Sequence, residues 1–320
     1  MPDHSDAPVE RKDNRMKKLH LVFLILQLAI LFITLLLLLQ DGNYGWTLFC
    51  IIPFSIGLTV GVYTRTFRTK RLMKGLFLVI LVIAFVSLLL VSLGAEGVMC
   101  VLMATGMIGL PAFAGVAAGF FIRNQLRILS LGVIFLLNTS AMVYDSQRTE
   151  VVHSVASVTV VVHAPKAKVW EVLTHPVTFS ASNNWFLRAG VSHPTAMFLQ
   201  RDPGNRLFLH CTYTNGRTRL PVVVLDPAGR LRFTMRDVIK TMTEVTLLGR
   251  TEPPHLEGYF TPEFGEFTVT PLGKTRCRVT ATTAYAYRIK PAFYWRWWTD
   301  YLTNAMHAHV LANVKRAAEQ

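Results

Sequence analysis

The sequence predicts a bundle of transmembrane helices joined to one soluble α+β domain. Two observations lead to this prediction. Apolar residues make up 52% of the 320 residues and charged residues only 16%, unlike an average soluble protein. The apolar excess is confined to the part before residue 145, and the remainder has an ordinary soluble composition. We therefore expect a basic tail at 1–18, a transmembrane helical domain at 19–145 and a soluble domain at 150–320.

Five apolar segments are expected to be transmembrane helices, because about 20 helical residues cross a hydrocarbon core of about 30 Å. They cover residues 19–39, 46–63, 75–94, 98–121 and 128–144. Pro53 and Pro111 fall inside two of them, where neighbouring helices can satisfy the freed carbonyl groups. The first segment follows a basic stretch, as a signal peptide would. It is too long for a signal-peptide core, so we expect an uncleaved anchor.

The positions of Lys and Arg predict the orientation. Before Asp145, every basic residue falls within 11–18, 65–74 or 123–127, and with five spans these three stretches share one side. By the positive-inside rule this side, with the N-terminus, is cytoplasmic. The expected protein is therefore a multi-pass protein of the cell (inner) membrane whose soluble domain lies outside the cytoplasm. If the fifth segment lay in the membrane interface instead, the soluble domain would be cytoplasmic.

Charge, cysteines and motifs exclude several classes of function. The net charge of +14 favours anionic lipid head groups over nucleic acid, because the basic residues of the soluble part are scattered. Four cysteines without CxxC spacing predict neither a metal site nor a disulfide framework. A disulfide between Cys211 and Cys277 is conceivable if the domain is external. No P-loop, GxGxxG or HExxH phrase occurs, so we expect no cofactor and no metal.

Apolar alternation and turn phrases, among them DPGN at 202–205 and DPAGR at 226–230, predict the elements of the soluble domain. A Val-rich strand at 154–164, expected to be buried on much of both faces, precedes a helix that Pro165 begins. In the last strand, alternation puts Cys277, Val279, Ala281, Thr283, Tyr285 and Tyr287 on one face. The other expected elements are a short helix at 184–189, strands at 195–200, 206–213, 219–225, 231–238, 265–272 and 275–289, and a long helix at 291–318.

Three phrases of the soluble domain resemble the START-related helix-grip superfamily, also called SRPBCC, of polyketide cyclase/dehydrase and lipid-transport proteins. They are APKAKVWEVL at 164–173, PPHLEGYF followed by GEF within 253–267, and the helix that begins at Pro291. The last two are similar to a bacterial subgroup with an N-terminal membrane domain. Asn304 departs from that pattern, which has a histidine there, and the strand around Cys277 lacks the usual leucine. These departures weaken a catalytic role for a histidine pair.

The resemblance implies a curved antiparallel sheet that wraps around the long C-terminal helix and leaves an apolar cavity. Members of the superfamily bind sterols, lipids or polyketides. The leading hypothesis is therefore a membrane-anchored domain that binds a lipid or other hydrophobic small molecule, with protein partners unknown. Aromatic side chains with one polar donor suit such a site, although they are also common in plain cores. The candidate ligand-binding residues are Tyr285, Tyr287, Trp295, Trp298 and Leu302.

Two other classes of function stay open. An enzyme similar to polyketide cyclases would need acid–base groups, and the candidates are Glu257, Glu266 and His307. A buried carboxylate with a raised pKa could act as the general acid. His210 and Cys211 cannot act as a pair, because adjacent strand residues point to opposite faces. The third class is a regulatory or interaction module that signals through the membrane bundle.

Overall fold

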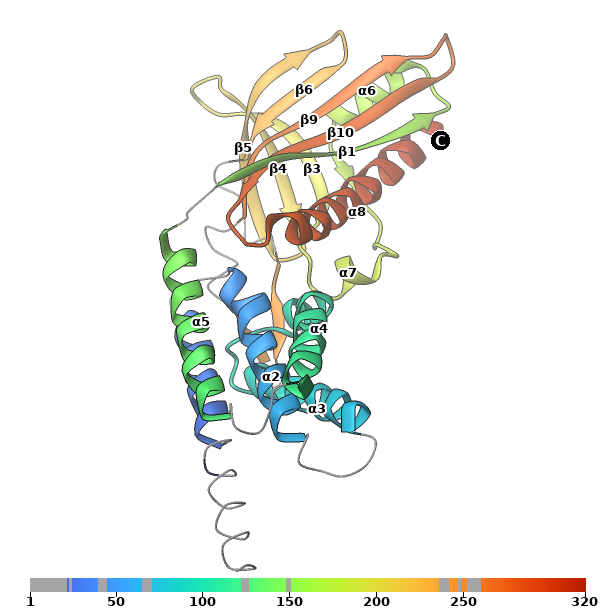
Figure 1. Cartoon of the computed structure of the whole chain (residues 1–320). Helices are drawn as coiled ribbons and strands as arrows, with labels where there is room; N and C mark the ends of the chain where they lie inside the picture. The colour runs from blue at the N-terminus through green and yellow to red at the C-terminus, as the bar shows by residue number, and fades with distance from the viewer. Residues whose placement is uncertain are drawn as a thin grey trace, which may run out of the picture. The chain divides into compact units, whose positions relative to one another are not determined.

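The computed structural model describes residues 22, 25–39, 45–64, 71–121, 127–147, 151–235, 242–246, 249–251 and 260–320. The chain separates into two compact units, and the main change from the first to the second falls between Arg148 and Thr149. The first is built from helices and the second contains the sheet (Figure 1). We call them the helical unit and the sheet unit.

The helices before residue 148 include two that are long and apolar enough to cross a membrane, rather than the five that the sequence predicted. Among the described residues, these are Leu72–Ser92 within α3 and Val98–Phe121. The apolar helices Ile25–Leu39 and Thr47–Val62 are shorter, and the expected first span begins outside the described residues. The elements from residue 47 onward are η1 Thr47–Ile51, α2 Ile52–Thr64, α3 Arg71–Ser92, α4 Val98–Phe121 and α5 Arg127–Gln147.

The fifth expected span, α5, is less apolar than α3 and α4 because it contacts other helices through polar side chains. Asn138 is buried and donates from Nδ2 to Ser55 Oγ at 2.8 Å. Asp145 is also buried, and its Oδ2 accepts hydrogen bonds from the backbone N–H and the hydroxyl of Thr47, each at 2.7 Å. The carboxylate thus satisfies an N–H group at the start of η1. Among the described residues α5 is not one of the helices long and apolar enough to cross a membrane, so the prediction of a fifth span is wrong.

Glycines allow α2 and α4 to pack backbone against backbone. A Cβ added at Gly57 would lie 1.9 Å from a backbone carbonyl oxygen of α4. One added at Gly119 would lie 2.4 Å from a carbonyl oxygen of α2, and Gly61 and Gly115 are similarly enclosed. Both helices therefore carry glycines four residues apart at their contact. This spacing of small residues is typical of helix pairs in membranes.

The sheet unit is built on an eight-stranded antiparallel sheet with the order β1-β10-β9-β6-β5-β4-β3-β2, and β7 and β8 form a separate hairpin. The order places the first strand beside the last. The strands are β1 Val152–Val162, β2 Val177–Thr178, β3 Pro194–Arg201, β4 Leu207–Tyr213, β5 Gly216–Asp226, β6 Arg230–Thr234, β7 Glu244–Thr246, β8 Gly249–Thr251, β9 Phe260–Pro271 and β10 Cys277–Tyr287.

Three helices accompany the sheet. They are α6 Lys166–Thr174, α7 Trp185–Arg188 and α8 Ala292–Glu319. The sheet curves over α8 (Figure 1), and Leu311, Val314 and Ala318 of this helix belong to the main core. The curved antiparallel sheet and the long terminal helix against it confirm the helix-grip architecture that the resemblance implied.

The first strand departs from the prediction that much of both its faces is buried. β1 lies at the end of the strand order and pairs with β10. Its burial alternates, so that Val162 is fully buried while Val155 is 56% exposed. A sheet with one face on the core leaves the other face to solvent, so β-branched residues on such a strand do not require burial on both faces.

The predicted turns are present. In the DPGN turn, Asp202 Oδ1 accepts a hydrogen bond at 2.9 Å from the backbone N–H four residues on. In the DPAGR turn, Asp226 Oδ1 accepts from the N–H of Ala228 at 2.8 Å, and Gly229 has a φ of 108°. That conformation favours glycine because any Cβ would be strained there. Both turns join antiparallel neighbours of the meander.

Candidate functional site

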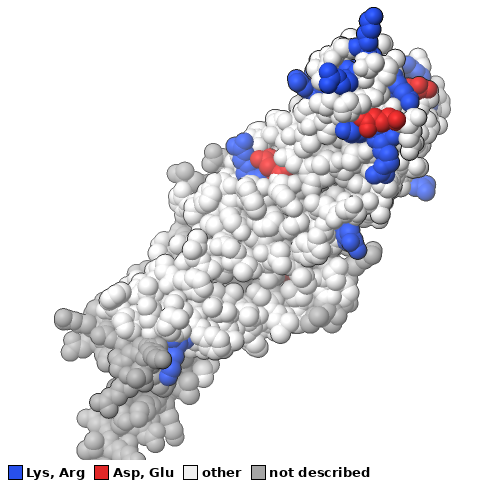
Figure 2. All heavy atoms as spheres, turned by 90° about the vertical axis from the view of Figure 1, so that its right-hand side faces the viewer, with Lys and Arg blue, Asp and Glu red and all other residues white. Residues whose placement is uncertain are grey.

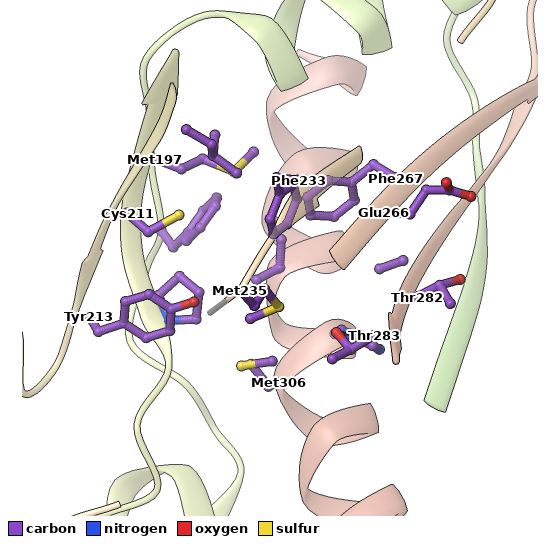
Figure 3. Close-up of a pocket in the computed structure, with 16 residues that line it drawn as sticks. Met197, Cys211, Tyr213, Phe233, Met235, Glu266, Phe267, Thr282, Thr283 and Met306 are labelled. Carbon is purple, nitrogen blue, oxygen red and sulfur yellow. Dashed lines mark hydrogen bonds between the residues drawn. The ribbon is translucent and has the colours of Figure 1, made fainter. Parts of the chain in front are cut away.

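A small cavity lies between the sheet and α8. Its volume is about 40 Å³, which is room for roughly three water molecules. Residues of β3, β4, β6, β9 and β10 line it together with residues of α8. Figure 3 shows Met197, Cys211 and Tyr213 on one side of the cavity and Thr283 on another. Most of the lining side chains are apolar, so the cavity suits an apolar group.

His307 of α8 is a buried imidazole that lines this cavity. It is 5% exposed, and its Nε2 lies 2.8 Å from Oγ1 of Thr283 on β10. Its Nδ1 has no hydrogen-bond partner among the described residues. Burial lowers the pKa of His307 to about 4, so the ring is neutral at pH 7. This buried nitrogen therefore has an unused hydrogen-bonding capacity in a side chain that borders the cavity.

The thiol of Cys211 and the phenol of Tyr213 in the cavity wall are weaker acids than usual. Burial raises the pKa of Cys211 to about 12 and also raises the pKa of Tyr213. Neither group is therefore ionised near neutral pH. Cys277 is also a free thiol, and β9, β6 and β5 separate its strand from that of Cys211. The disulfide that the sequence allowed is thus not formed, and both cysteines serve as small buried side chains.

Of the two candidate carboxylates, Glu266 borders the cavity and Glu257 lies outside the described residues. In Figure 3 the carboxylate of Glu266 points away from the cavity. Its Oε2 accepts a hydrogen bond from Nε of Arg230 at 2.8 Å, and the two side chains form an ion pair. A general-acid role for Glu266 stays a prediction that this geometry does not favour.

Tyr285 and Tyr287 were predicted to bind ligand, but they are buried near the end of β10 and do not line the cavity. With Ala156 of β1 they form a separate apolar cluster. The hydroxyl of Tyr285 donates to Oδ1 of Asp300 at 2.5 Å, and that of Tyr287 donates to the backbone oxygen of Ala292 at 3.0 Å. Burial raises the pKa of both phenols. Both hydroxyls thus tie β10 to α8, and their contact with a ligand stays a prediction.

The three predicted residues on α8 also lie outside the cavity lining. Trp295 is buried, whereas Trp298 and Leu302 are partly exposed. Trp298 packs against Phe186 of α7, with ring centroids 5.5 Å apart. The structure therefore brings only His307 and Glu266, of all the predicted site residues, to the edge of this cavity within the part of the chain that is described.

Sequence reasoning missed most of the lining. It includes three methionines, Met197, Met235 and Met306, and the ring of Phe233. Strand periodicity carried a signal for some of these residues, because alternation in β3 and β6 points Met197 and Phe233 toward the core. No sequence feature distinguished residues that border free space from residues that fill the core.

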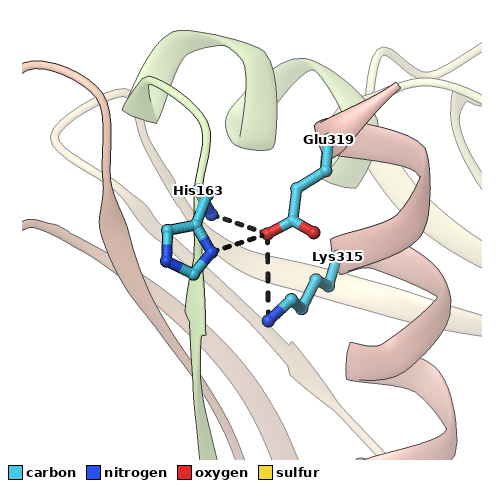
Figure 4. A network of polar contacts seen from close by, with 3 residues as sticks. All are labelled: His163, Lys315 and Glu319. Atoms are coloured by element: carbon cyan, nitrogen blue, oxygen red, sulfur yellow. Dashed lines mark hydrogen bonds and ion pairs between the residues drawn. The ribbon is translucent and has the colours of Figure 1, made fainter.

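Polar contacts hold the C-terminal half of α8 in place. Oδ1 of Asn313 accepts hydrogen bonds from the backbone N–H and the hydroxyl of Ser180, at 3.0 and 2.9 Å. Oε1 of Glu319 accepts from the backbone N–H of His163 at 2.7 Å and lies 3.8 Å from Nζ of Lys315 (Figure 4). The hydrogen bond from His163 lowers the pKa of Glu319. These contacts fix the part of the helix that follows His307.

Comparisons with known proteins give likenesses of fold. No family model matches the sequence, and no curated protein matches it. Norcoclaurine synthase from Thalictrum flavum is similar, with 14% identity over 52% of this chain and 86% of that chain and a TM-score of 0.32. The Zhui aromatase/cyclase from Streptomyces sp. R1128 has 16% identity over 53% of this chain and 94% of that chain, with a TM-score of 0.26. A START superfamily protein from Mycobacterium smegmatis has 14% identity over 53% of this chain and 99% of that chain, with a TM-score of 0.30. Because these TM-scores are low, the START-related assignment is one of fold, and it rests on the strand order and α8 of this chain.

Proposed function

We propose that the sheet unit binds a hydrophobic small molecule in the cavity beside α8, and that the helical unit anchors the chain in a membrane. The binding proposal rests on one observation, an apolar cavity bordered by a buried His307 whose Nδ1 has no partner among the described residues. Unpartnered buried polar atoms are rare in proteins. A molecule with one polar group and an apolar body would satisfy that nitrogen and bury its own apolar surface.

The size of the cavity implies that its lining moves when a ligand binds. Its volume of about 40 Å³ is well below the roughly 300–1,000 Å³ of small-molecule pockets. Three lining methionines, Met197, Met235 and Met306, suit such movement because their side chains are unbranched and adaptable. Burial of about 200 Å² of apolar ligand surface contributes on the order of 5 kcal/mol, from which the cost of ordering and rearrangement is subtracted. The described cavity is therefore the closed form.

The surface of the helical unit supports the membrane anchor. Large apolar side chains are exposed on its helices, among them Phe77, Leu110 and Leu136. On the face drawn in Figure 2, basic and acidic side chains gather over the sheet unit, and few lie on the described helices of the helical unit. Such a surface suits lipid better than water. The close glycine contact of α2 with α4 also supports a membrane location, because small residues at this spacing are typical of helix pairs in membranes.

The topology that we propose has α3 and α4 as a membrane-spanning pair. The basic stretches at 65–74 and 123–127 flank this pair on one side, which the positive-inside rule makes cytoplasmic. The acidic loop at 95–97 then lies on the opposite side. Without a crossing by α5 the sheet unit lies on the cytoplasmic side, the alternative that the sequence left open, whereas a crossing by α5 would place it outside the cytoplasm.

Catalysis is a second candidate function, and the environment of His307 favours it. A neutral imidazole at an apolar cavity can accept a proton from a bound substrate, as a general base does. Nε2 is engaged with Thr283, which leaves Nδ1 for the substrate. With a pKa of about 4 the ring is a weak base, and the carboxylate of Glu266 points elsewhere. Binding without turnover is therefore the function that the geometry supports best.

Native mass spectrometry of the full chain in mild detergent tests the binding proposal. The change Ala281→Val adds two carbon atoms at the cavity wall, so it should displace the co-purified molecule. The matched control is Ala284→Val, the same change at a buried position of β10 outside the lining, and it should carry the wild-type load. Circular dichroism checks that both variants fold.

Three results decide between the candidate functions. A wild-type chain that carries no molecule and takes up no added N-phenyl-1-naphthylamine would contradict binding. Equal loads in the Ala281→Val and Ala284→Val variants would contradict this location. A converted compound on the wild type and its precursor on His307→Gln would favour catalysis.

A further inference from the structure

We propose a second binding site, within the helical unit, for an apolar molecule that carries a hydroxyl group. The site is a cavity of about 430 Å³ between the helix Ile25–Leu39 and α5. It does not depend on the cavity beside His307. Its distinguishing feature is the side-chain carbonyl oxygen of Asn138, which is buried and has no partner among the described residues.

Gln27 and Asn138 of the lining belong to a cluster of four polar side chains, and the other two are Ser55 and Thr59. Gln27 donates from Nε2 to Thr59 Oγ1 at 2.5 Å, and the Thr59 hydroxyl donates to the backbone oxygen of Ser55 at 2.8 Å. Asn138 donates from Nδ2 to Ser55 Oγ at 2.8 Å. All four residues are more than nine-tenths buried. In apolar surroundings such a cluster is costly unless each of its polar atoms has a partner.

The hydrogen bonds of Asn138 fix which way its amide points. Its Nδ2 lies 2.8 Å from the backbone oxygen of Ile134, an atom that can only accept. The atom assigned as Nδ2 must therefore be the donor, and Oδ1 must be the acceptor. Asn138 is 6% exposed and lines the cavity. The unpartnered atom is thus an acceptor that needs a donor from a bound molecule.

The rest of the lining selects an apolar body. It includes Ile30, Leu31 and Phe135, and the cavity volume lies within the range of small-molecule pockets. The hydroxyl of Thr34 also borders the cavity, but it donates to the backbone oxygen of Ile30 at 2.9 Å. Gln27 and Thr139 line the cavity as well, and Asn138 Oδ1 is the buried acceptor among these side chains that has no partner in the described chain.

The lining also argues against other polar groups on the bound molecule, namely cationic groups and groups without a proton to donate. No carboxylate lies among the described lining residues, so a cationic donor would be buried without a counter-charge. An ether, ester or ketone has no proton to donate and would place one acceptor against another. A neutral O–H group on a long apolar chain satisfies both conditions.

Photolabelling of the full chain in detergent tests this site. The probes are a hexadecanol that carries a diazirine and the methyl ether of the same molecule, with the labelled peptides identified by mass spectrometry. We expect the alcohol to label residues 26–34 and 132–142 at about tenfold lower concentration than the ether, the difference that one hydrogen bond makes. Asn138→Leu should abolish this preference.

Two glycine variants test whether labelling depends on this cavity. An added Cβ at Gly132 meets no atom within 4 Å, and this residue lines the cavity, so Gly132→Leu should obstruct part of it and remove labelling. Gly109 of α4 is equally open and does not line the cavity, so Gly109→Leu is the matched control and should keep labelling. Gly132→Leu leaves the polar cluster intact, so it tests the site even if Asn138→Leu does not fold.

The outcomes are distinct from those for the sheet unit. Equal labelling by alcohol and ether would mean a gap that acyl chains fill, and it would overturn the proposal. Undiminished labelling of Gly132→Leu would overturn it as well. Labelling that Gly132→Leu removes, while the molecule at His307 is retained, would establish this site separately from the proposed function.

Discussion

The middle and the C-terminal end of β10 face α8 in different ways. Toward its middle, Ala281 and Thr283 border a cavity, and Thr283 contacts His307. Near its C-terminal end, Tyr285 and Tyr287 are 0% and 2% exposed and do not line this cavity. Both phenolic hydroxyls have acceptors on α8, whereas Nδ1 of His307 has none in the described chain. Free space beside an unpartnered polar atom is therefore the basis for the proposed ligand site, whereas the aromatic hydroxyl groups already have protein partners.

Removing a tyrosine ring should give the largest effect on folding. Tyr285→Ala deletes a fully buried ring and its hydrogen bond to Asp300. We expect the free energy of unfolding to fall by about 3–5 kcal/mol, with no change in the molecule that co-purifies. Urea unfolding of the full chain, followed by tryptophan fluorescence, measures the first, and native mass spectrometry the second. A changed ligand with a small loss of stability would show that the tyrosine end is the ligand site.

Acidification should lower the free energy of unfolding through His307, the histidine that borders the cavity. Above pH 6.5 the imidazole of His307 is neutral in both the folded and the unfolded state. As the pH falls from 6.5 to about 4, the unfolded state takes up a proton that the folded state, with its lowered pKa, does not. Stability is therefore lost across this range, by about 3 kcal/mol when complete.

The variant His307→Gln isolates this contribution. The lowered pKa values of His309 and Glu319 act in the same direction, so the wild type alone does not identify the group. Glutamine keeps a side chain that can bond to Thr283 but does not titrate. The variant should lose less stability between pH 6.5 and 4 than the wild type does, in unfolding curves recorded at each pH. Identical losses in the two proteins would contradict the burial of a neutral His307.

Removing only a hydroxyl should give the smallest effect. Tyr285→Phe keeps the ring and deletes the hydrogen bond to Asp300, so it should cost about 1 kcal/mol of folding stability. Ligand affinity should not change, because this hydroxyl does not border the described cavity. Tyr287→Phe is the matched control at the same end of the strand. Weakened binding of ligand in Tyr285→Phe alone would return that residue to the site.

Much of the sheet unit was predictable because its signals are local. The DPGN and DPAGR phrases predicted two turns, and alternation placed the odd-numbered residues from Cys277 to Tyr287 on one face of the last strand, where all six are buried. The cavity was not predictable, because it depends on which turn of α8 meets which residue of β10. Asp300 meets Tyr285 and His307 meets Thr283, and no local pattern encodes that match.

The helical unit shows the same limit. Apolar length predicted α3 and α4, which need no partner to satisfy their backbone. It overestimated α5, where Asn138 and Asp145 are polar because they meet Ser55 and Thr47 on other helices. A hydropathy average treats each residue independently of its contacts, whereas in the structure these polar side chains bind to other helices.

A density map of the full chain together with its co-purified molecule would locate the ligand. We expect density between the sheet and α8, within hydrogen-bond distance of Nδ1 of His307, with one or more of Met197, Met235 and Met306 moved to make room. The tyrosine end of β10 should be unchanged. Density in contact with Tyr285 or Trp298, with the cavity beside His307 still closed, would contradict this expectation.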